Sequence, residues 1–367
     1  MGLIKPLYDD ICDMPSGTNN LITDVPGVTV GHCTIRTETL KTGVTAILPQ
    51  QDNLFLHKLP AAAHVINGFG KSAGLIQINE LGSLETPIVL TNTFGVGTGF
   101  NALVRYMLNQ NKDIGDTTGT VNPVVMECND GRINDIRAMA ITEDHVQQAL
   151  TGTKTNFVEG AVGAGTGMCC YQLKGGIGSA SRQIVVDDKT FMLGALVLSN
   201  FGSLPDLEFY GCRIGSKLAT FAQSEKASEK GSIIVIIATD LPLDHRQLTR
   251  ICKRASVGIT RTGAFIGNGS GEIALAFSTA NRIAHYSDHQ LSTKTTISEN
   301  QIDRLFRATV SVVEESVLSS LLHAETTIDH NGHSHKSFLD AVRDMQKAQP
   351  DPEVDVLLER LGVGKAI

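Results

Sequence analysis

The spacing of apolar residues along the chain predicts short β-strands interspersed with amphipathic helices. Short runs rich in Val, Ile and other apolar side chains have the length and composition of buried strands. These runs cover residues 21–30, 43–48, 88–91, 124–127, 183–186, 192–200, 232–240 and 272–278. Residues 32–42 are expected to connect the first two strands. Residues 61–66 and 76–81 fit either a strand or a short helix, and both alternatives stay open.

Apolar residues at helical spacing predict five helices, at residues 101–110, 142–150, within 207–227, 244–258 and 300–323. The strongest is 300–323, whose apolar positions repeat every three or four residues. Thr142 is expected to cap the second helix, with His145 in the place that Glu takes in a capping box. Gly258 is expected to end the fourth helix. Residues 95–100 (GVGTGF) are expected to form a turn before the first helix.

Two glycine-rich segments, residues 95–99 and 163–167, share the pattern G-x-G-T-G. Their flanking sequences do not match, so duplication is disfavoured. No Pro/Ser-rich linker or shift in composition marks a domain boundary in the 367 residues, and we expect a single domain.

Composition and charge exclude several classes of function. The hydrophobic fraction of 41% suits a globular protein, and no apolar run reaches transmembrane length, so no membrane partner is expected. The net charge of −7 and the lack of a basic cluster argue against a nucleic-acid partner. Residues 1–6 lack the basic-then-apolar order of a signal peptide, which predicts a cytoplasmic protein. The seven cysteines are scattered, so we expect reduced thiols.

Motifs for cofactors and metals are weak. The two glycine-rich segments lack the third glycine of a dinucleotide loop, and Gly70-Lys71-Ser72 lacks the first glycine of a phosphate loop. Neither H-E-x-x-H nor G-x-S-x-G is present. His330, His333 and His335 lie in a polar segment that could hold a metal, but a solvated loop is the default interpretation. We therefore expect no cofactor and no metal.

Among the segments of the chain, Gly231-Ser232 is the strongest candidate for a catalytic site. Ser232 opens a β-branched run, residues 233–238, that reads as a buried strand. If the bond between Gly231 and Ser232 were cut, Ser232 would carry both a hydroxyl nucleophile and a free α-amine, whose ordinary pKa of about 7.7–8.0 suits a base near neutral pH. The alternative is a glycine that ends a helix before an ordinary strand.

Four segments, taken together and in order, resemble one family: residues 198–202 (LSNFG), 230–235 (KGSIIV), 268–272 (NGSGE) and 276–281 (AFSTAN). The chain resembles the self-processing serine aminopeptidases of the DmpA/BapA type (peptidase S58 type), which comprise L-aminopeptidase/D-esterase-amidases and β-aminopeptidases. The resemblance extends from residue 24 to residue 326. It implies an α+β fold, a four-layer αββα sandwich resembling Ntn hydrolases with different connectivity. It also implies self-cleavage into chains 1–231 and 232–367 that stay together.

The resemblance assigns roles to particular residues. Ser232 matches the nucleophile, both for self-cleavage and for substrate, and Ser270 and Glu272 match a hydroxyl–carboxylate pair that relays protons around it. Asn200 matches the donor of an oxyanion hole. Glu127 matches the acid that meets the free ammonium group of the substrate. Without the resemblance, Ser270 and Glu272 would be a glycine-rich turn into a strand, Asn200 a turn residue, and Glu127 a surface residue at a strand end.

The chain departs from the family pattern at two points. Residues 128–132 contain no tyrosine where some members have an aromatic hydroxyl, and Lys71 stands where an acidic residue is expected. The resemblance predicts an enzyme that removes amino-terminal residues from short peptides, amides or esters, and a homo-oligomer of processed heterodimers. Two alternatives are an acyl transferase like ornithine acetyltransferases, disfavoured because that group generally uses threonine, and an unprocessed binding relative without catalysis.

Overall fold

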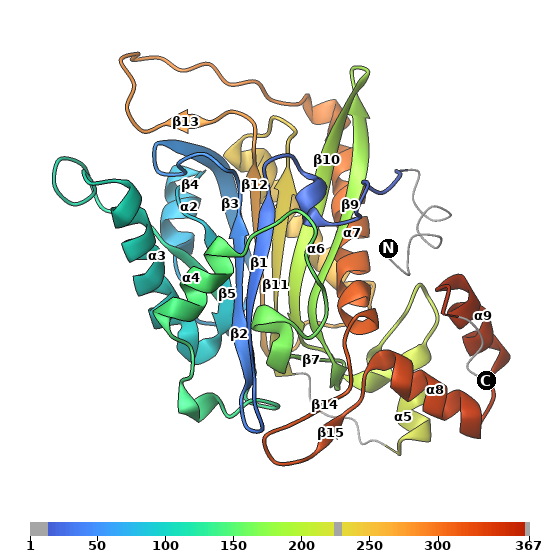
Figure 1. Ribbon diagram of the computed structural model, residues 1–367. Coiled ribbons are helices and arrows are strands. Elements are labelled where there is room, and N and C mark those ends of the chain that lie inside the picture. Colours follow the sequence, from blue (N-terminus) through green and yellow to red (C-terminus); the bar gives the residue numbers. More distant parts are fainter. Residues whose placement is uncertain (1–13, 224–229, 364–367) are drawn as a thin grey trace.

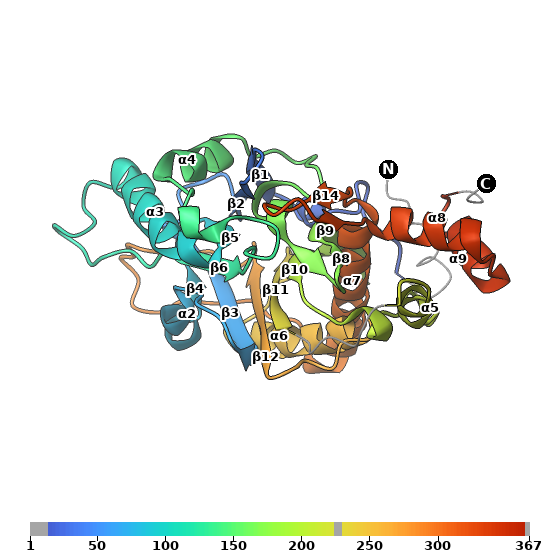
Figure 2. The same ribbon diagram turned by 90° about the horizontal axis from the view of Figure 1, so that it is seen from below.

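The computed structural model describes residues 14–223 and 230–363 and has four layers, with two facing sheets between two layers of helices (Figure 1, Figure 2). The smaller sheet has the order β1 (Thr29–Arg36), β2 (Lys41–Leu48), β5 (Ile88–Asn92) and β6 (Val124–Cys128). β5 and β6 run parallel, whereas the other neighbours in this sheet are antiparallel.

The larger sheet contains the strand that Ser232 occupies. Its order is β13 (Ile283–Ala284), β3 (His57–Gly68), β12 (Gly269–Ser278), β11 (Lys230–Thr239), β10 (Lys189–Asn200) and β9 (Gly176–Val186), with β4 (Ser83–Leu84) paired to β3. β11 runs antiparallel to β10 and parallel to β12. The strand ends that carry Asn200 and Ser232 therefore meet, because these two residues are directly paired.

Three hydrophobic clusters hold the layers together. Side chains from one face of β11, such as Ile234 and Ile236, pack between the sheets, and those from its other face, such as Ile233 and Val235, pack against the helices beyond the larger sheet. Those helices are α6 (His245–Thr260) and α7 (Ile302–Leu322). On the smaller sheet, α3 (Val96–Gln110) and α4 (Glu143–Thr151) cover the outer face. This is the four-layer αββα sandwich, with mixed helices and strands, that the resemblance implies.

The remaining elements are short and lie around the sandwich. The helices are α2 (Leu75–Leu81), α5 (Ile214–Phe221), α8 (Phe338–Ala348) and α9 (Pro352–Arg360). The short strands are β7 (Cys169–Cys170), β8 (Leu173–Lys174), β14 (Thr327–Ile328) and β15 (Ser334–His335). Single 3₁₀ turns span Ile22–Asp24, Thr93–Gly95, Ile136–Ala138, Gly163–Gly167, Leu204–Asp206 and Glu299–Gln301. Among residues 14–223 and 230–363, no helix combines the length and apolarity needed to cross a membrane.

Several predictions from the pattern are confirmed. The capped helix begins after Thr142, whose backbone N–H donates to Nδ1 of His145 at 3.1 Å. The long helix α7 matches the predicted residues 300–323 closely. The helix predicted within residues 207–227 is the shorter α5, and residues 224–227 lie outside the described part of the chain. Residues 61–66 lie in β3, and residues 76–81 form most of α2.

Three predictions about element boundaries are wrong. The strand predicted at 21–30 begins only at Thr29, because Gly27 with φ of +90° makes a turn, and the strand then runs through residues assigned to the connection. Helix α3 begins at Val96, so the glycine-rich segment is its first turn. Gly258 does not end α6, which continues to Thr260; a Cβ at this position would lie 2.7 Å from Cβ of Val313, so the glycine allows α6 and α7 to approach closely.

Candidate active site

A cavity of about 660 Å³ opens where the ends of β6, β10 and β11 meet. Ser232, Asn200 and Glu127 line it, together with Lys71, Arg132 and Cys169. Three of the predicted site residues, which lie far apart in the sequence, therefore share one cavity. Their strands bring them together: Asn200 ends β10 and is paired with Ser232 near the start of β11, and Glu127 lies at the end of β6 in the facing sheet.

The hydroxyl of Ser232 is directed at the peptide bond before it. Its Oγ donates a hydrogen bond to the carbonyl oxygen of Gly231 at 2.6 Å, and the residue is 5% exposed. Across the parallel pairing, Ser232 faces Gly271, and a Cβ built on Gly271 would lie 3.0 Å from Oγ of Ser232. The glycine at 271 thus leaves room for the hydroxyl, which lies close to the carbonyl group it would have to attack in self-cleavage.

Gly231 has a backbone that other residues rarely adopt. Its φ is +151°, and a Cβ at this position would lie only 2.0 Å from the carbonyl oxygen of Asn200. Both the conformation and the close approach of two strands therefore require glycine before Ser232. The residue that the sequence suggested as an ordinary helix end lies inside β11.

The amide group of Asn200 is held by hydrogen bonds on both sides. Its Oδ1 accepts from the backbone N–H of Cys169 at 2.9 Å, and its Nδ2 donates to the carbonyl oxygen of Asn129 at 2.9 Å. These contacts settle which end of the amide is the donor. Nδ2 carries a second N–H, so a fixed donor remains available to an oxygen atom bound in the cavity.

Lys174 supports this arrangement from the protein interior. Its fully buried ammonium group donates to the carbonyl oxygens of Met168 at 2.8 Å, Gly165 at 3.1 Å and Gly175 at 2.7 Å. The Met168 carbonyl belongs to the same peptide unit as the Cys169 N–H that holds Asn200. Burial lowers the pKa of Lys174 to about 8. Nothing in the sequence marks Lys174 as buried, because a lysine in a strand as short as β8 resembles a surface residue.

The carboxylate of Glu127 is buried and fixed in orientation. Its Oε1 accepts the backbone N–H of Lys71 at 2.8 Å, and its Oε2 accepts the hydroxyl of Thr93. The side chain is 3% exposed yet lines the cavity. Glu127 is therefore a buried carboxylate aimed at the cavity, not the surface residue that the sequence left as an alternative. An ammonium group is the complementary ligand for such an anion.

Ser270 and Glu272 lie beside Ser232 on the neighbouring strand, and neither of them lines the cavity. In the register, Ser270 pairs with Gly231 and Glu272 with Ile233. Side chains alternate along a strand, and Ala274 and Ala276 pack on the helix side of the sheet whereas Ile273 and Leu275 pack between the sheets. Both residues thus belong to the face opposite to Ser232. Both are completely buried.

The histidine-rich segment lies next to the cavity. His335 Nε2 contacts Asp329 Oδ2 at 3.0 Å, and its Nδ1 lies 3.7 Å from Sγ of Cys169, which lines the cavity. His333 contacts the same carboxylate at 3.4 Å. Neighbouring hydrogen bonds keep the pKa of Asp329 well below its ordinary value, although desolvation by burial acts in the opposite direction. In the described part of the chain, no three His, Cys, Asp or Glu side chains form a metal-binding group.

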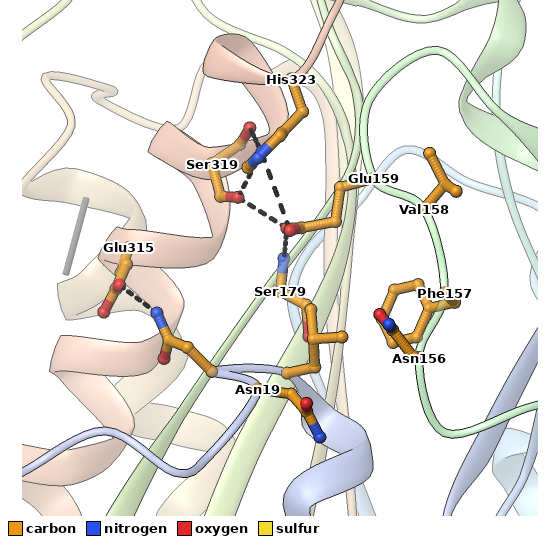
Figure 3. A pocket seen from close by; sticks show the side chains of 11 residues that line it. Asn19, Asn156, Phe157, Val158, Glu159, Ser179, Glu315, Ser319 and His323 are labelled. Carbon is orange, nitrogen blue, oxygen red and sulfur yellow. Dashed lines mark hydrogen bonds and ion pairs between the residues drawn. The ribbon is translucent and has the colours of Figure 1, made fainter. Parts of the chain in front are cut away.

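A second, smaller cavity of about 180 Å³ lies by the C-terminal end of α7 (Figure 3). Its central carboxylate, Glu159, accepts the Ser179 N–H at 2.7 Å and the Ser319 hydroxyl at 2.6 Å, and it lies 3.7 Å from Nδ1 of His323. Glu315 accepts from Asn20 and pairs with the buried Arg182. The carboxylates of this smaller cavity are thus held by protein groups, whereas Ser232, Asn200 and Glu127 line the larger cavity.

Comparison with known protein families identifies one match over most of the chain. The family model described as Peptidase family S58 matches residues 20–335. The Beta-peptidyl aminopeptidase BapA of Sphingosinicella microcystinivorans is 34% identical over 343 residues, which cover 87% of this chain and 85% of that protein.

Solved structures agree with this match. A protein of Pyrococcus horikoshii OT3 is 46% identical and superposes with a TM-score of 0.85, covering 91% of this chain and 94% of that one. The L-aminopeptidase D-Ala-esterase/amidase of Ochrobactrum anthropi is 34% identical with a TM-score of 0.83, covering 91% and 95%. That protein is described as a prototype for the serine aminopeptidases and a variant of the Ntn hydrolase fold.

Proposed function

Because this chain belongs to peptidase family S58 and is an aminopeptidase by that membership, we propose that it cuts itself between Gly231 and Ser232 and then uses Ser232 as nucleophile. The products are chains 1–231 and 232–367, which remain together as one catalytic domain. The observation that carries the proposal is the hydrogen bond from Ser232 Oγ to the Gly231 carbonyl, in a cavity lined by Asn200 and Glu127.

Self-cleavage proceeds by an N-to-O shift. Oγ of Ser232 attacks the carbonyl carbon of Gly231, its proton passes to the departing nitrogen, and an ester replaces the amide. Water then hydrolyses the ester, leaving a carboxylate on Gly231 and an α-amine on Ser232. Glycine at position 231 favours this step, because the close approach to the Asn200 carbonyl leaves no room for a Cβ and keeps the Gly231 carbonyl beside Ser232 Oγ.

After cleavage, Ser232 is the first residue of its chain and is no longer held by Gly231. Its amine and hydroxyl can then turn toward the neighbouring strand, where Ser270 and Glu272 flank Gly271. We assign to Ser270 and Glu272 the relay that takes the hydroxyl proton, since serine is a weak nucleophile without a positioned base. Ser232 thus lies beside the Gly231 carbonyl before cleavage, and beside Ser270 and Glu272 during substrate turnover.

We assign substrate binding to Asn200 and Glu127, which line the cavity with Ser232. The fixed Nδ2–H of Asn200 stabilises the oxyanion that forms when Ser232 attacks the substrate carbonyl. Glu127 pairs with the free ammonium group of the substrate, which selects for unblocked amino termini. An acyl-enzyme on Ser232 forms and is hydrolysed by water.

The substrates are short peptides, amino-acid amides or esters with a free amine. One relative is named for β-peptidyl substrates and another for L-amino acids and D-Ala esters or amides. Substrates that begin with a β-amino acid and substrates that begin with an α-amino acid are therefore both candidates. We place the enzyme in the cytoplasm as a homo-oligomer of processed heterodimers. Six described cysteines are free thiols, which supports a reducing compartment.

The test compares free and blocked substrates. Free-amine p-nitroanilides should be hydrolysed, and their N-acetyl forms should be poor substrates. Glu127→Ala should raise KM steeply for the free-amine substrates, because breaking a buried charge pair typically costs about 2–5 kcal/mol, while self-cleavage continues. Glu80→Ala, an exposed glutamate on α2, is the matched control. If acetylated substrates were hydrolysed as fast as free-amine substrates, the result would contradict the aminopeptidase mechanism and indicate a general amidase.

A further inference from the structure

The active-site cavity has an excess of positive charge that binding a free amine does not explain. Glu127 is the acidic residue that lines it, whereas Lys71 and Arg132 line it with positive charge. Among residues 14–223 and 230–363, neither Lys71 nor Arg132 forms an ion pair. Once the substrate ammonium neutralises Glu127, two cations remain at the cavity without a counter-charge.

Lys71 lies beside the place where the substrate amine is held. Its backbone N–H donates to Glu127 Oε1 at 2.8 Å, so the residue is fixed next to the ammonium site. Its own ammonium group does not pair with Glu127; its Nζ lies 5.0 Å from the centre of the Phe69 ring, and Phe69 also lines the cavity. A cation at this distance from a ring face is held by the ring and stays available to an anion.

Arg132 adds positive charge on the Asn200 side of the cavity. It follows Asn129, whose carbonyl accepts from Asn200, in the loop after β6. Arg132 and Cys169 line the same cavity, and the positive charges of Lys174 and Arg132 partly offset the rise that burial causes in the pKa of the Cys169 thiol. Guanidinium groups pair well with carboxylates, and their charge persists at every working pH.

From this charge distribution we infer that the cavity prefers substrates whose amino-terminal residue carries a carboxylate, which Lys71 meets while Glu127 holds the ammonium group. This inference rests on the proposed aminopeptidase function and adds the substrate class. The carboxylate can come from an α-aspartyl, an α-glutamyl or a β-aspartyl residue. In a β-aspartyl residue the ammonium and carboxylate groups share one carbon, so a substrate of this kind requires Lys71 Nζ to reach the ammonium site beside Glu127.

The experiment measures kcat/KM for aspartyl, glutamyl and β-aspartyl p-nitroanilides relative to alanyl and β-alanyl p-nitroanilides. The wild type should prefer at least one acidic substrate over its neutral counterpart by about fivefold, the effect of one exposed ion pair. Lys71→Glu should invert that preference, and Arg132→Gln should reduce it. Lys189→Glu introduces the same change of charge at a separate cavity and should leave the ratio unchanged.

Salt provides a second readout that needs no variant. Because both cations are exposed, raising the ionic strength from about 0.01 M to 1 M should lower the acidic preference of the wild type by screening. The inference would be overturned if neutral substrates were hydrolysed as fast as acidic ones. It would also be overturned if neither Lys71→Glu nor salt changed the preference for acidic substrates. In both cases the aminopeptidase function would stand. If no free-amine substrate in the panel were hydrolysed, both would be overturned.

Discussion

The hydroxyl of Ser232 donates its hydrogen bond to the carbonyl oxygen of Gly231, 2.6 Å away and one residue earlier in the chain. Ser232 Oγ therefore lies against the peptide bond whose cleavage we propose, while Ser270 and Glu272 belong to the opposite face of the sheet. This relationship separates two states of one site. In the proposed mechanism, cleavage frees Ser232 from Gly231, so that its amine and hydroxyl can turn toward Ser270 and Glu272.

Gly231→Ala should block self-cleavage. The new Cβ would lie 2.0 Å from the carbonyl oxygen of Asn200, and the φ of +151° is costly for alanine, on the order of 1–3 kcal/mol before any clash. The backbone has to shift, which moves the carbonyl away from Ser232 Oγ. Gel electrophoresis over time should show an uncut chain under conditions where the wild type is cut. Cleavage at the wild-type rate would show that the close approach at Gly231 is dispensable.

Asn200→Ala should lower kcat by about 10²–10³ with a small change in KM, because the lost donor acts on the charge that develops during the reaction. Asn129→Ala is the matched control, since it keeps the backbone carbonyl that accepts from Asn200. Steady-state kinetics on a free-amine p-nitroanilide measures both variants. A rise in KM without a fall in kcat would assign Asn200 to substrate binding. An equal fall in kcat for both variants would assign it a structural role.

Patterning and motif order predicted the elements that carry the candidate site. The β-branched run after Ser232 became β11, the run ending at Asn200 became β10, and the strand ending near Glu127 became β6. The pairing of Asn200 with Ser232 places two motifs in contact that lie far apart in sequence. Strong periodicity also predicted α7, since its buried face repeats over many turns.

Other features depend on tertiary placement and left no local signal. Lys174 is buried because three backbone carbonyls converge on its ammonium group, and no pattern around residue 174 encodes that convergence. From the sequence, Gly258 is predicted to end a helix, but glycine is required there because α6 packs closely on α7. The C-terminal helices α8 and α9 are short and amphipathic, and the spacing of apolar residues did not predict them.

Lys174 should make stability depend on pH in the alkaline range. Burial lowers its pKa to about 8 in the folded chain, below the ordinary value of about 10.4 in the unfolded chain. Between these values the unfolded state binds more protons, so the free energy of unfolding rises with pH there; below pH 8 both states are protonated and the burial penalty is constant. Relative to Lys174→Met, the wild type should gain on the order of 2–3 kcal/mol from pH 7 to pH 10. Denaturant unfolding measures this, and a flat or falling difference would contradict it.

Gly258→Ala should destabilise the fold, and Gly97→Ala should not. A Cβ at position 258 meets Val313 and the backbone of Val310 at 2.7–2.8 Å, so overpacking should cost about 1–3 kcal/mol. A Cβ at position 97 meets nothing within 4 Å on an exposed turn of α3, so alanine should stabilise that helix by up to about 1 kcal/mol. Melting temperatures should shift in opposite directions. Equal shifts would show that Gly258 has no special role in packing α6 on α7.

The most direct test of the account is the mass of the purified protein under denaturing conditions. The wild type should separate into two species with the masses of residues 1–231 and 232–367, and the second should begin with Ser232. Ser232→Ala should give a single species with the mass of the whole chain and no hydrolysis of free-amine substrates. A wild-type chain that stays whole after long incubation, yet hydrolyses those substrates, would contradict the claim that cleavage at Gly231–Ser232 creates the nucleophile.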